Sequence, residues 1–258
     1  MNADNLATVR ALQPVDLDEL ASIADLQTRT DRKYLVPQNY LEHFLSRLDA
    51  RALEIRGVRT FAYESVYFDT PDFASYLSAA RRRPRRFKVR TRSYAESGAC
   101  MLEVKTRDAR GRTVKHRVPH PLHQRNDLTA AARAFVRTVD AAAPSADLLQ
   151  RTLTTTYRRA TLVLHGMPAR VTIDINTEFR TPDGRAVCLD QVALVETKTA
   201  GQPSAADRVL WRDGYRPATV SKFGTGLAAL NHDLPANKWH RVLLLHFGSE
   251  HRSMVTRQ

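Results

Sequence analysis

The feature that most constrains this chain is a stretch in which charged and apolar residues alternate. In "KVRTRSYAESGACMLEVKTRD", residues 88–108, two alternating segments flank a polar turn. Successive side chains of a β-strand point to opposite faces, so the charged positions of each segment share one face. These positions are Lys88, Arg90 and Arg92 in the first segment and Glu103, Lys105 and Arg107 in the second. The stretch therefore predicts a β-hairpin with one charged and one apolar face.

Alternation of the same kind predicts further strands, at residues 29–36, 61–70, 112–118, 152–164, 169–179 and 192–200. Their charged faces carry Lys33, Lys115, Arg117, Arg170, Glu196 and Lys198. A single charged face is ordinarily solvated in a half-buried antiparallel strand. Repetition favours a closed antiparallel β-barrel with the charged faces inward, around a lumen that stays wet or holds a polyanion. Dry burial of so many cations would cost too much free energy.

Helical spacing of apolar residues predicts a few helices around this sheet, at residues 15–27, 36–50, 127–143 and 203–213. No internal repeat, low-complexity linker or shift in composition marks a second domain. The predicted fold class is therefore α+β, with one domain over residues 1–258 that contains a closed barrel and peripheral helices.

The charge of the chain narrows the class of ligand. The 258 residues carry a formal net charge of +13, mostly through arginine, whose planar fork suits phosphate and carboxylate oxygens. Cys100 and Cys188 form no disulfide framework and no zinc spacing, which favours a reducing compartment. No apolar run approaches the roughly 18 residues of a membrane-spanning helix. We expect a soluble, cytoplasmic protein that binds a polyanion.

The charged strands resemble a known family. Eight short motifs stand in its order: "RTDRKYLV", "VYFDT", "RFKVRTRSY", "LEVKT", "TYRRA", "RVTIDIN", "LVETKT" and "VSKF". Together they resemble the VTC domain, the polyphosphate polymerase domain of the triphosphate tunnel metalloenzyme (CYTH-like) superfamily, from about residue 29 to 230. The resemblance implies a β-barrel tunnel in which basic residues bind the triphosphate of ATP and a growing phosphate chain. It also implies that a carboxylate holds a divalent metal, Mn²⁺ or Mg²⁺.

Residue by residue, the resemblance implies three sets of site residues. The catalytic set is Lys33, Arg90, Arg92, Arg159 and Lys222. The phosphate-binding set is Lys88, Lys105, Lys115, Arg117, Arg170 and Lys198. Glu196 is the first candidate for the metal and Glu103 the second.

Two departures from the family pattern bear on these roles. The superfamily often has two glutamates before the first lysine, where this chain has Arg29 and Asp31, which weakens the case for metal binding through that strand. Thr172 stands where some members have an arginine, so we expect weaker phosphate binding by the strand that contains "RVTIDIN".

The predicted function is transfer of a terminal phosphoryl group from ATP, or another nucleoside triphosphate, to polyphosphate with a divalent metal. Phosphoryl transfer depends on positioning and charge neutralisation, which a ring of cations with a carboxylate supplies. A non-catalytic polyanion-binding module and a triphosphatase of the same superfamily stay open as alternatives. No specific nucleic acid is expected, and a membrane-protein partner is left open. The run "RRRPRR", residues 81–86, is either a solvated loop or a landing place for an acidic polymer.

Overall fold

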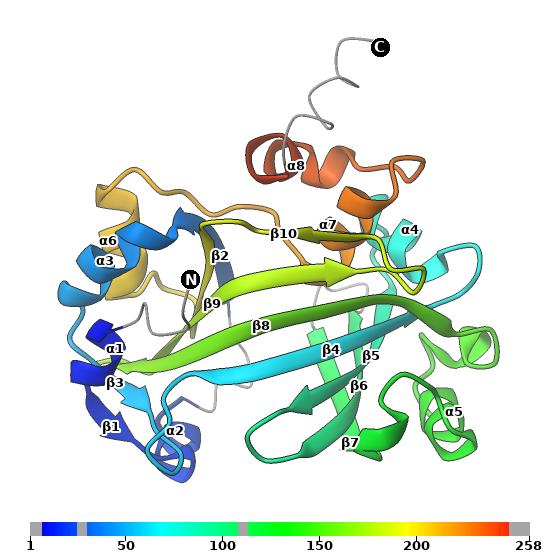
Figure 1. Cartoon of the computed structure of the whole chain (residues 1–258), viewed down its shortest axis with the longest axis horizontal. Helices are drawn as coiled ribbons and strands as arrows, with labels where there is room; N and C mark the ends of the chain where they lie inside the picture. Colours follow the sequence, from blue (N-terminus) through cyan, green and yellow to red (C-terminus); the bar gives the residue numbers. More distant parts are fainter. Residues whose placement is uncertain (1–6, 25–29, 108–112, 248–258) are drawn as a thin grey trace. The chain divides into compact units, whose positions relative to one another are not determined.

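The computed structural model describes residues 7–24, 30–107 and 113–247, which form two compact units (Figure 1). Unit 1 comprises the described parts of residues 1–62, 157–177 and 189–219. Unit 2 comprises those of residues 63–156, 178–188 and 220–258. Three long strands, β4, β8 and β9, contribute residues to both units. Arg29 of the predicted first strand lies outside the described residues.

The strands belong to one large sheet. They are β1 Gln13–Val15, β2 Thr30–Pro37, β3 Ala50–Leu53, β4 Phe61–Asp69, β5 Arg86–Tyr94, β6 Ala99–Arg107, β7 Thr113–Pro119, β8 Gln150–Leu164, β9 Ala169–Arg180, β10 Ala186–Cys188 and β11 Val192–Thr199. The hydrogen-bonded order is β2-β11-β9-β8-β4-β5-β6-β7, with β10 paired to β9, β3 to β8 and β1 to β3. Within the described residues no pair joins β2 to β7, so the predicted closure of the sheet into a barrel stays a prediction.

The predicted hairpin of residues 88–108 is confirmed as the antiparallel pair β5–β6. Its register places Lys88 opposite Lys105 and Arg90 opposite Glu103. Burial alternates along β5, because every second side chain from Phe87 to Ser93 is buried and those between are partly exposed. The period-two reading of the sequence therefore assigned both faces correctly. The other predicted strands are confirmed to within a few residues, whereas the three-residue β1 and β10 and the four-residue β3 were missed.

In unit 1, helices cover the apolar face of the strands. Its helices are α1 Ala7–Ala11, α2 Leu17–Ala24, the 3-10 helix η1 Gln38–Tyr40, α3 Leu41–Ser46 and α6 Ala205–Arg212. Phe44 of α3 and Leu210 of α6 pack in one buried cluster with Tyr34, Val171 and Val195 of the strands. α3 and α6 lie side by side in Figure 1, and the Tyr40 hydroxyl donates a hydrogen bond of 2.6 Å to Asp213 at the end of α6.

Unit 2 has its own core and helices. The helices are α4 Ala74–Ala80, η2 Leu122–Gln124, α5 Ala130–Arg137, η3 Ala143–Ser145, α7 Lys222–Leu230, η4 Asn237–Trp239 and α8 His240–His246. Val136 of α5 packs against Val66, Val89 and Leu102 of the strands. No helix within the described ranges is long and apolar enough to cross a lipid bilayer.

The predicted helix over residues 36–50 was wrong at its start. Strand β2 continues to Pro37, and the α-helix begins only at Leu41 because a 3-10 turn comes between them. Helix α7 was not predicted, and its two glycines are residues of low helix propensity. These glycines permit close packing: a Cβ at Gly224 would come within 2.2 Å of the Trp239 ring, and a Cβ at Gly226 within 2.2 Å of the Phe179 ring.

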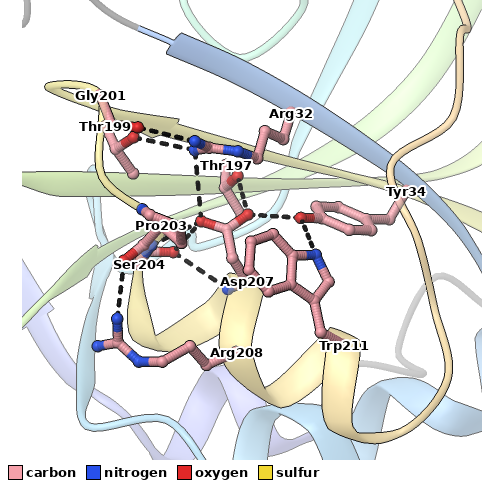
Figure 2. Close-up of polar contacts among 10 residues, drawn as sticks. All are labelled: Arg32, Tyr34, Thr197, Thr199, Gly201, Pro203, Ser204, Asp207, Arg208 and Trp211. Atoms are coloured by element: carbon pink, nitrogen blue, oxygen red, sulfur yellow. Dashed lines mark hydrogen bonds and ion pairs between the residues drawn. The ribbon is translucent and has the colours of Figure 1, made fainter.

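A buried polar network anchors α6 to the strands of unit 1 (Figure 2). Asp207 is fully buried, and one carboxylate oxygen accepts hydrogen bonds from the hydroxyls of Tyr34 at 2.6 Å and Thr197 at 2.7 Å. The other oxygen accepts from the backbone N–H and the hydroxyl of Ser204, both at 2.7 Å. Ser204 in turn accepts from the Asp207 N–H, which completes a capping box.

The ionised form of Asp207 is the one that this network stabilises. Burial would raise the pKa of Asp207, but the hydrogen bonds from Tyr34, Thr197 and Ser204 outweigh burial and hold the pKa below its usual value of 3.8. The carboxylate therefore links the N-terminus of α6 to β2 and β11 as a charged acceptor.

We predict that Asp207→Asn lowers the free energy of unfolding by about 1–3 kcal/mol, the cost of disturbing buried hydrogen bonds. An amide cannot accept on both sides, so its NH₂ group must face donors that the carboxylate satisfied. Chemical denaturation of the wild type and the variant measures this cost. Asp49→Asn is the control because the Asp49 side chain is 87% exposed, and its effect should stay within about 0.5 kcal/mol.

The stability difference between the wild type and Asp207→Asn should depend on pH. Because the folded-state pKa of Asp207 is lowered, its stabilisation is fully present above the usual value of 3.8 and is lost as the pH falls through the folded-state value. The stability difference between wild type and Asp207→Asn should therefore shrink in acid. A difference that stays constant from neutral pH into this acidic range would contradict the assignment.

Candidate functional site

The predicted site residues occupy two charged strand faces, one in each unit. The basic face belongs to unit 2 and comprises Lys88, Arg90, Arg92, Glu103, Lys105, Lys115 and Arg117. The mixed face belongs to unit 1 and comprises Lys33, Arg159, Arg170, Asp174, Glu196 and Lys198.

The basic face has rows of cations across three strands. Lys88 lies opposite Lys105, which lies opposite Lys115. In the next row Glu103 lies between Arg90 and Arg117. Like charges directly opposite one another in a sheet are destabilising, so six cations around one carboxylate leave a surplus that an anionic ligand would relieve.

Arg90 is the most tightly held cation of the basic face. Its Nε and Nη2 donate to Oε2 of Glu103 at 2.8 and 2.5 Å, and its Nη1 donates to the Tyr67 hydroxyl at 3.1 Å. Burial would raise the pKa of Glu103, but Arg90 and Arg92 outweigh it and hold the pKa well below its usual range. Glu103, which is 2% exposed, therefore acts as a fixed anchor for the Arg90 guanidinium.

Neighbouring side chains orient the rest of this face. The Arg92 Nε donates to the Ser65 hydroxyl at 3.3 Å, and its guanidinium lies 5.6 Å from the Tyr63 ring centroid. Lys88 Nζ donates to the Ser221 hydroxyl at 2.7 Å. Ser221 is the N-cap of α7, and Lys222 is the first residue of that helix, so the predicted Lys222 is brought beside the Lys88 end of the face.

On the mixed face, Glu196 is clamped between two lysines. Lys33 Nζ lies 3.0 Å from its Oε1, and Lys198 Nζ lies 2.8 Å from its Oε2. Burial would raise the pKa of Glu196, but Lys198 and Lys33 outweigh it and hold the pKa well below its usual range. Burial lowers the pKa of Lys198 to about 8 even though Glu196 raises it. Thr172 lies directly opposite Glu196, where an arginine would have added a cation.

Arg159 makes a second buried pair on the mixed face. Its Nε and Nη2 donate to the two oxygens of Asp174 at 2.5 and 2.7 Å, in a two-pronged arrangement. The Asp174 side chain is 2% exposed. Arg170 lies directly opposite Lys198 on the neighbouring strand. Pairs of opposite charge thus compensate most of this face internally, in contrast to the basic face.

Sequence reasoning missed the partners that hold the cations. Tyr67, Ser65 and Tyr63 belong to β4, whose period-two alternation places them on the face opposite to Val66 and Phe68, and this signal was available in the sequence. The pairing of Asp174 with Arg159 was not predicted either. The contact between Ser221 and Lys88 joins residues far apart in the sequence, so no local pattern indicated it.

The two predicted metal ligands differ in accessibility. The Glu196 side chain is 14% exposed and that of Glu103 is 2% exposed. Among the described residues no three His, Cys, Asp or Glu side chains come together as a ligand set. A site with one protein carboxylate suits Mg²⁺ or Mn²⁺ only if phosphate oxygens and water complete the coordination, as is usual for Mg²⁺ bound with nucleotides.

Comparison with known families agrees with this arrangement of charged strands. Residues 28–231 match the VTC domain family, and this range is well over half of the chain. The chain therefore belongs to the VTC domain family. Comparison with curated protein sequences found no significant match.

Solved structures show a similar fold. HpAC1 from Hippeastrum, described as an adenylyl cyclase candidate with a dominant triphosphatase activity, aligns over 80% of this chain and 98% of its own. The TM-score is 0.50 and the sequence identity is 16%. A candidate adenylate cyclase from Bacillus halodurans aligns over 71% of this chain and 85% of its own, with a TM-score of 0.44 and 16% identity. At this identity the likeness to HpAC1 concerns the fold alone.

We predict that Asp174→Asn lowers the free energy of unfolding by about 3 kcal/mol, because it leaves the Arg159 charge buried without its partner. The double variant Arg159→Met/Asp174→Leu should recover most of this loss, since it removes both charges together. Denaturant titration compares the two with Asp147→Asn, a control whose side chain is 67% exposed. A double variant as unstable as the single one would show that the pair is not the cause.

Proposed function

We propose that this protein is a metal-dependent phosphotransferase that binds a nucleoside triphosphate and polyphosphate and transfers the terminal phosphoryl group to the phosphate chain. The observation that carries the proposal is the basic face, where six cations surround one carboxylate. Arginine and lysine arranged in rows are suited to neutralise the oxygens of successive phosphates. Membership of the VTC domain family supports the same class of ligand.

The cations are the residues that act on the phosphates. Arg90 is held in place by Glu103 and Tyr67, so little side-chain entropy is lost when its guanidinium binds a phosphate. Arg92 and Lys88 are held in the same way by Ser65 and Ser221. A preorganised set of cations stabilises the charge on the equatorial oxygens of a transferring phosphoryl group more effectively than mobile side chains do.

The protonation states favour transfer over hydrolysis. A phosphate chain end is already an ionised oxygen nucleophile, whereas water needs a base whose pKa is near the working pH. Glu103 and Glu196 both have pKa values held well below the usual range by their cationic neighbours, so they are weak bases at neutral pH. The proposed acceptor is therefore polyphosphate rather than water.

Glu196 is the residue proposed to hold the divalent metal, with Glu103 as the second candidate. Glu196 has the more exposed carboxylate and lies among Lys33, Lys198 and Thr172. Held by Glu196, Mg²⁺ or Mn²⁺ would neutralise part of the negative charge of the phosphates. Lys33 and Lys198 are paired with the two Glu196 oxygens, so a triphosphate that bound these lysines would leave the carboxylate available to hold the ion.

The proposal includes the closed barrel and the single tunnel domain that the sequence predicts. Its support is the alternation of charged and apolar faces in each unit, with helices over the apolar faces. Triphosphate hydrolysis is the second candidate, because a triphosphatase activity is described for HpAC1.

The test is direct. Purified protein incubated with ATP and Mn²⁺ should produce polyphosphate, which gel electrophoresis separates from orthophosphate. The proposed transfer depends on a divalent metal that neutralises phosphate charge. Omission of the metal should therefore abolish the product. Release of orthophosphate alone would establish the triphosphatase, and binding of tripolyphosphate without either product would leave a polyanion-binding module.

We predict that Glu196→Gln reduces turnover by about 10-fold to 100-fold or more. Substitution of residues that only support a metal ligand already costs roughly this much activity. Tripolyphosphate should still bind without metal, and more tightly, because one negative charge has been removed. Calorimetry with tripolyphosphate, before and after Mn²⁺ is added, measures the two effects separately.

Glu54→Gln is the matched control for this variant. Glu54 also forms an ion pair, with Arg59 at 2.7 Å, but it belongs to neither charged face. It should leave turnover and both affinities unchanged. Full turnover in Glu196→Gln, with its fold verified by thermal denaturation, would move the metal assignment to Glu103.

A further inference from the structure

One polar side chain of unit 1 is buried without an interaction that accounts for it. Thr172 of β9 is 4% exposed, and within the described residues its hydroxyl oxygen, Oγ1, has no hydrogen-bond partner. Most buried polar side-chain atoms have such a partner, because a hydroxyl that leaves water without one costs free energy. The Thr172 hydroxyl is therefore a candidate for contact with a ligand.

Strand alternation and register place this hydroxyl beside Glu196. Val171 and Ile173 belong to the apolar cluster of unit 1, so Thr172 between them points to the mixed face. Thr172 lies directly opposite Glu196 in the antiparallel pair of β9 and β11. The Cβ atoms of such a pair are about 4.5–5.5 Å apart, so the hydroxyl and the carboxylate can both contact one atom placed between them.

The carboxylates near Thr172 are held by cations and not by the hydroxyl. Glu196 is paired with Lys33 and Lys198 at 3.0 and 2.8 Å. Asp174 accepts two hydrogen bonds from Arg159. The fold therefore gains no hydrogen bond from Thr172. Valine has nearly the same shape and a high strand propensity, and it would fill the position without burying a polar group.

The chemistry of a hydroxyl narrows the class of ligand. Its oxygen can give a lone pair to a cation or a proton to an anion. An anion would bind more strongly to Lys33 and Lys198, because charge-assisted hydrogen bonds are about twice as strong as neutral ones. A divalent metal is better served, since Mg²⁺ in one class of nucleoside triphosphatases is held by a Ser or Thr hydroxyl together with an Asp carboxylate.

We propose that the Thr172 hydroxyl and the Glu196 carboxylate together form the protein part of the divalent-metal site. This inference rests on the proposed function, which assigns the metal to Glu196. Among the described residues no three His, Cys, Asp or Glu side chains come together, so a neutral oxygen is a useful additional ligand here. The hydroxyl supplies this ligand without changing the charge of the mixed face.

The experiment measures the affinity of the protein for tripolyphosphate alone and for its Mn²⁺ complex by calorimetry. Thr172→Val should weaken binding of the Mn²⁺ complex by about tenfold, the lower end of the loss for residues that only support a metal ligand, and leave metal-free tripolyphosphate unchanged. Thr172→Ser keeps the hydroxyl and should bind both ligands like wild type. Equal weakening of both ligands in Thr172→Val would show that the hydroxyl donates to a phosphate, and it would overturn the proposal.

Thr177→Val is the matched control. Thr177 lies on the same strand, is 1% exposed, and within the described residues its hydroxyl also has no hydrogen-bond partner. It stands five residues from Thr172, roughly 15 Å along an extended strand. Each valine variant removes a buried hydroxyl without a partner, so both should melt at the wild-type temperature or above it. The same loss of Mn²⁺-complex affinity in Thr177→Val would trace the effect to packing and overturn the proposal.

Glu196→Gln separates this inference from the proposed function. If Glu196→Gln weakens binding of the Mn²⁺ complex and Thr172→Val binds it like wild type, the role of Thr172 is refuted while the metal assignment to Glu196 stands. If Glu196→Gln binds the Mn²⁺ complex as tightly as wild type does, the assignment to Glu196 fails and the shared site fails with it. Thr172→Ala, which cannot overpack the strand, should show the same selective loss as Thr172→Val.

Discussion

The pairing of charges across strand register is the interaction on which the rest of this structure depends. Glu196 is almost buried and ionised because Lys33 and Lys198 each bind one of its oxygens. Glu103 is buried and ionised because it accepts from Arg90. An isolated carboxylate at either position would cost several kilocalories per mole or become protonated. The strand faces can therefore carry ionised groups only in combinations that adjacent strands complete.

The two faces differ in how far this compensation goes. On the mixed face each carboxylate meets at least one cation, and the bidentate Arg159–Asp174 pair resembles a structural ion pair. On the basic face Lys88, Lys105 and Lys115 lie opposite one another in register, and Lys115 Nζ lies 3.7 Å from the Glu103 carboxylate. The ion pairs of the mixed face contribute mainly to the fold. The basic face has more cations than carboxylates, and such an excess of positive charge attracts anions from solution.

Much of the fold was predictable because the strands obey one simple period. Alternation along residues 88–108 identified the buried and charged faces of β5 and β6, since a strand that is half buried must alternate. Helix α7 was not predictable in this way, because Gly224 and Gly226 lower helix propensity and are explained only by the rings of Trp239 and Phe179 that pack against them. Short strands such as β10 have too few residues to show any period.

The candidate site was predictable in its charges and not in its geometry. Period and family resemblance placed Arg90, Glu103, Lys33 and Glu196 on charged faces, but register between strands decides which charges meet, and register depends on turns and packing across the sheet. The strand register decides that Glu196 contacts two lysines. It also decides that Lys105 lies between two further lysines, Lys88 and Lys115.

The basic face carries six cations and one carboxylate, and the repulsion among these cations bears on stability. A ligand that binds only the folded state stabilises it in proportion to the logarithm of its concentration over its dissociation constant. If polyphosphate is the ligand, as proposed, its binding would offset the repulsion between Lys88, Lys105 and Lys115, and the same residues would contribute to ligand affinity and to folding stability. The Glu103 carboxylate limits this repulsion in the ligand-free protein, because it neutralises one charge while orienting Arg90. One buried carboxylate thus offsets part of the repulsion within a strongly cationic face.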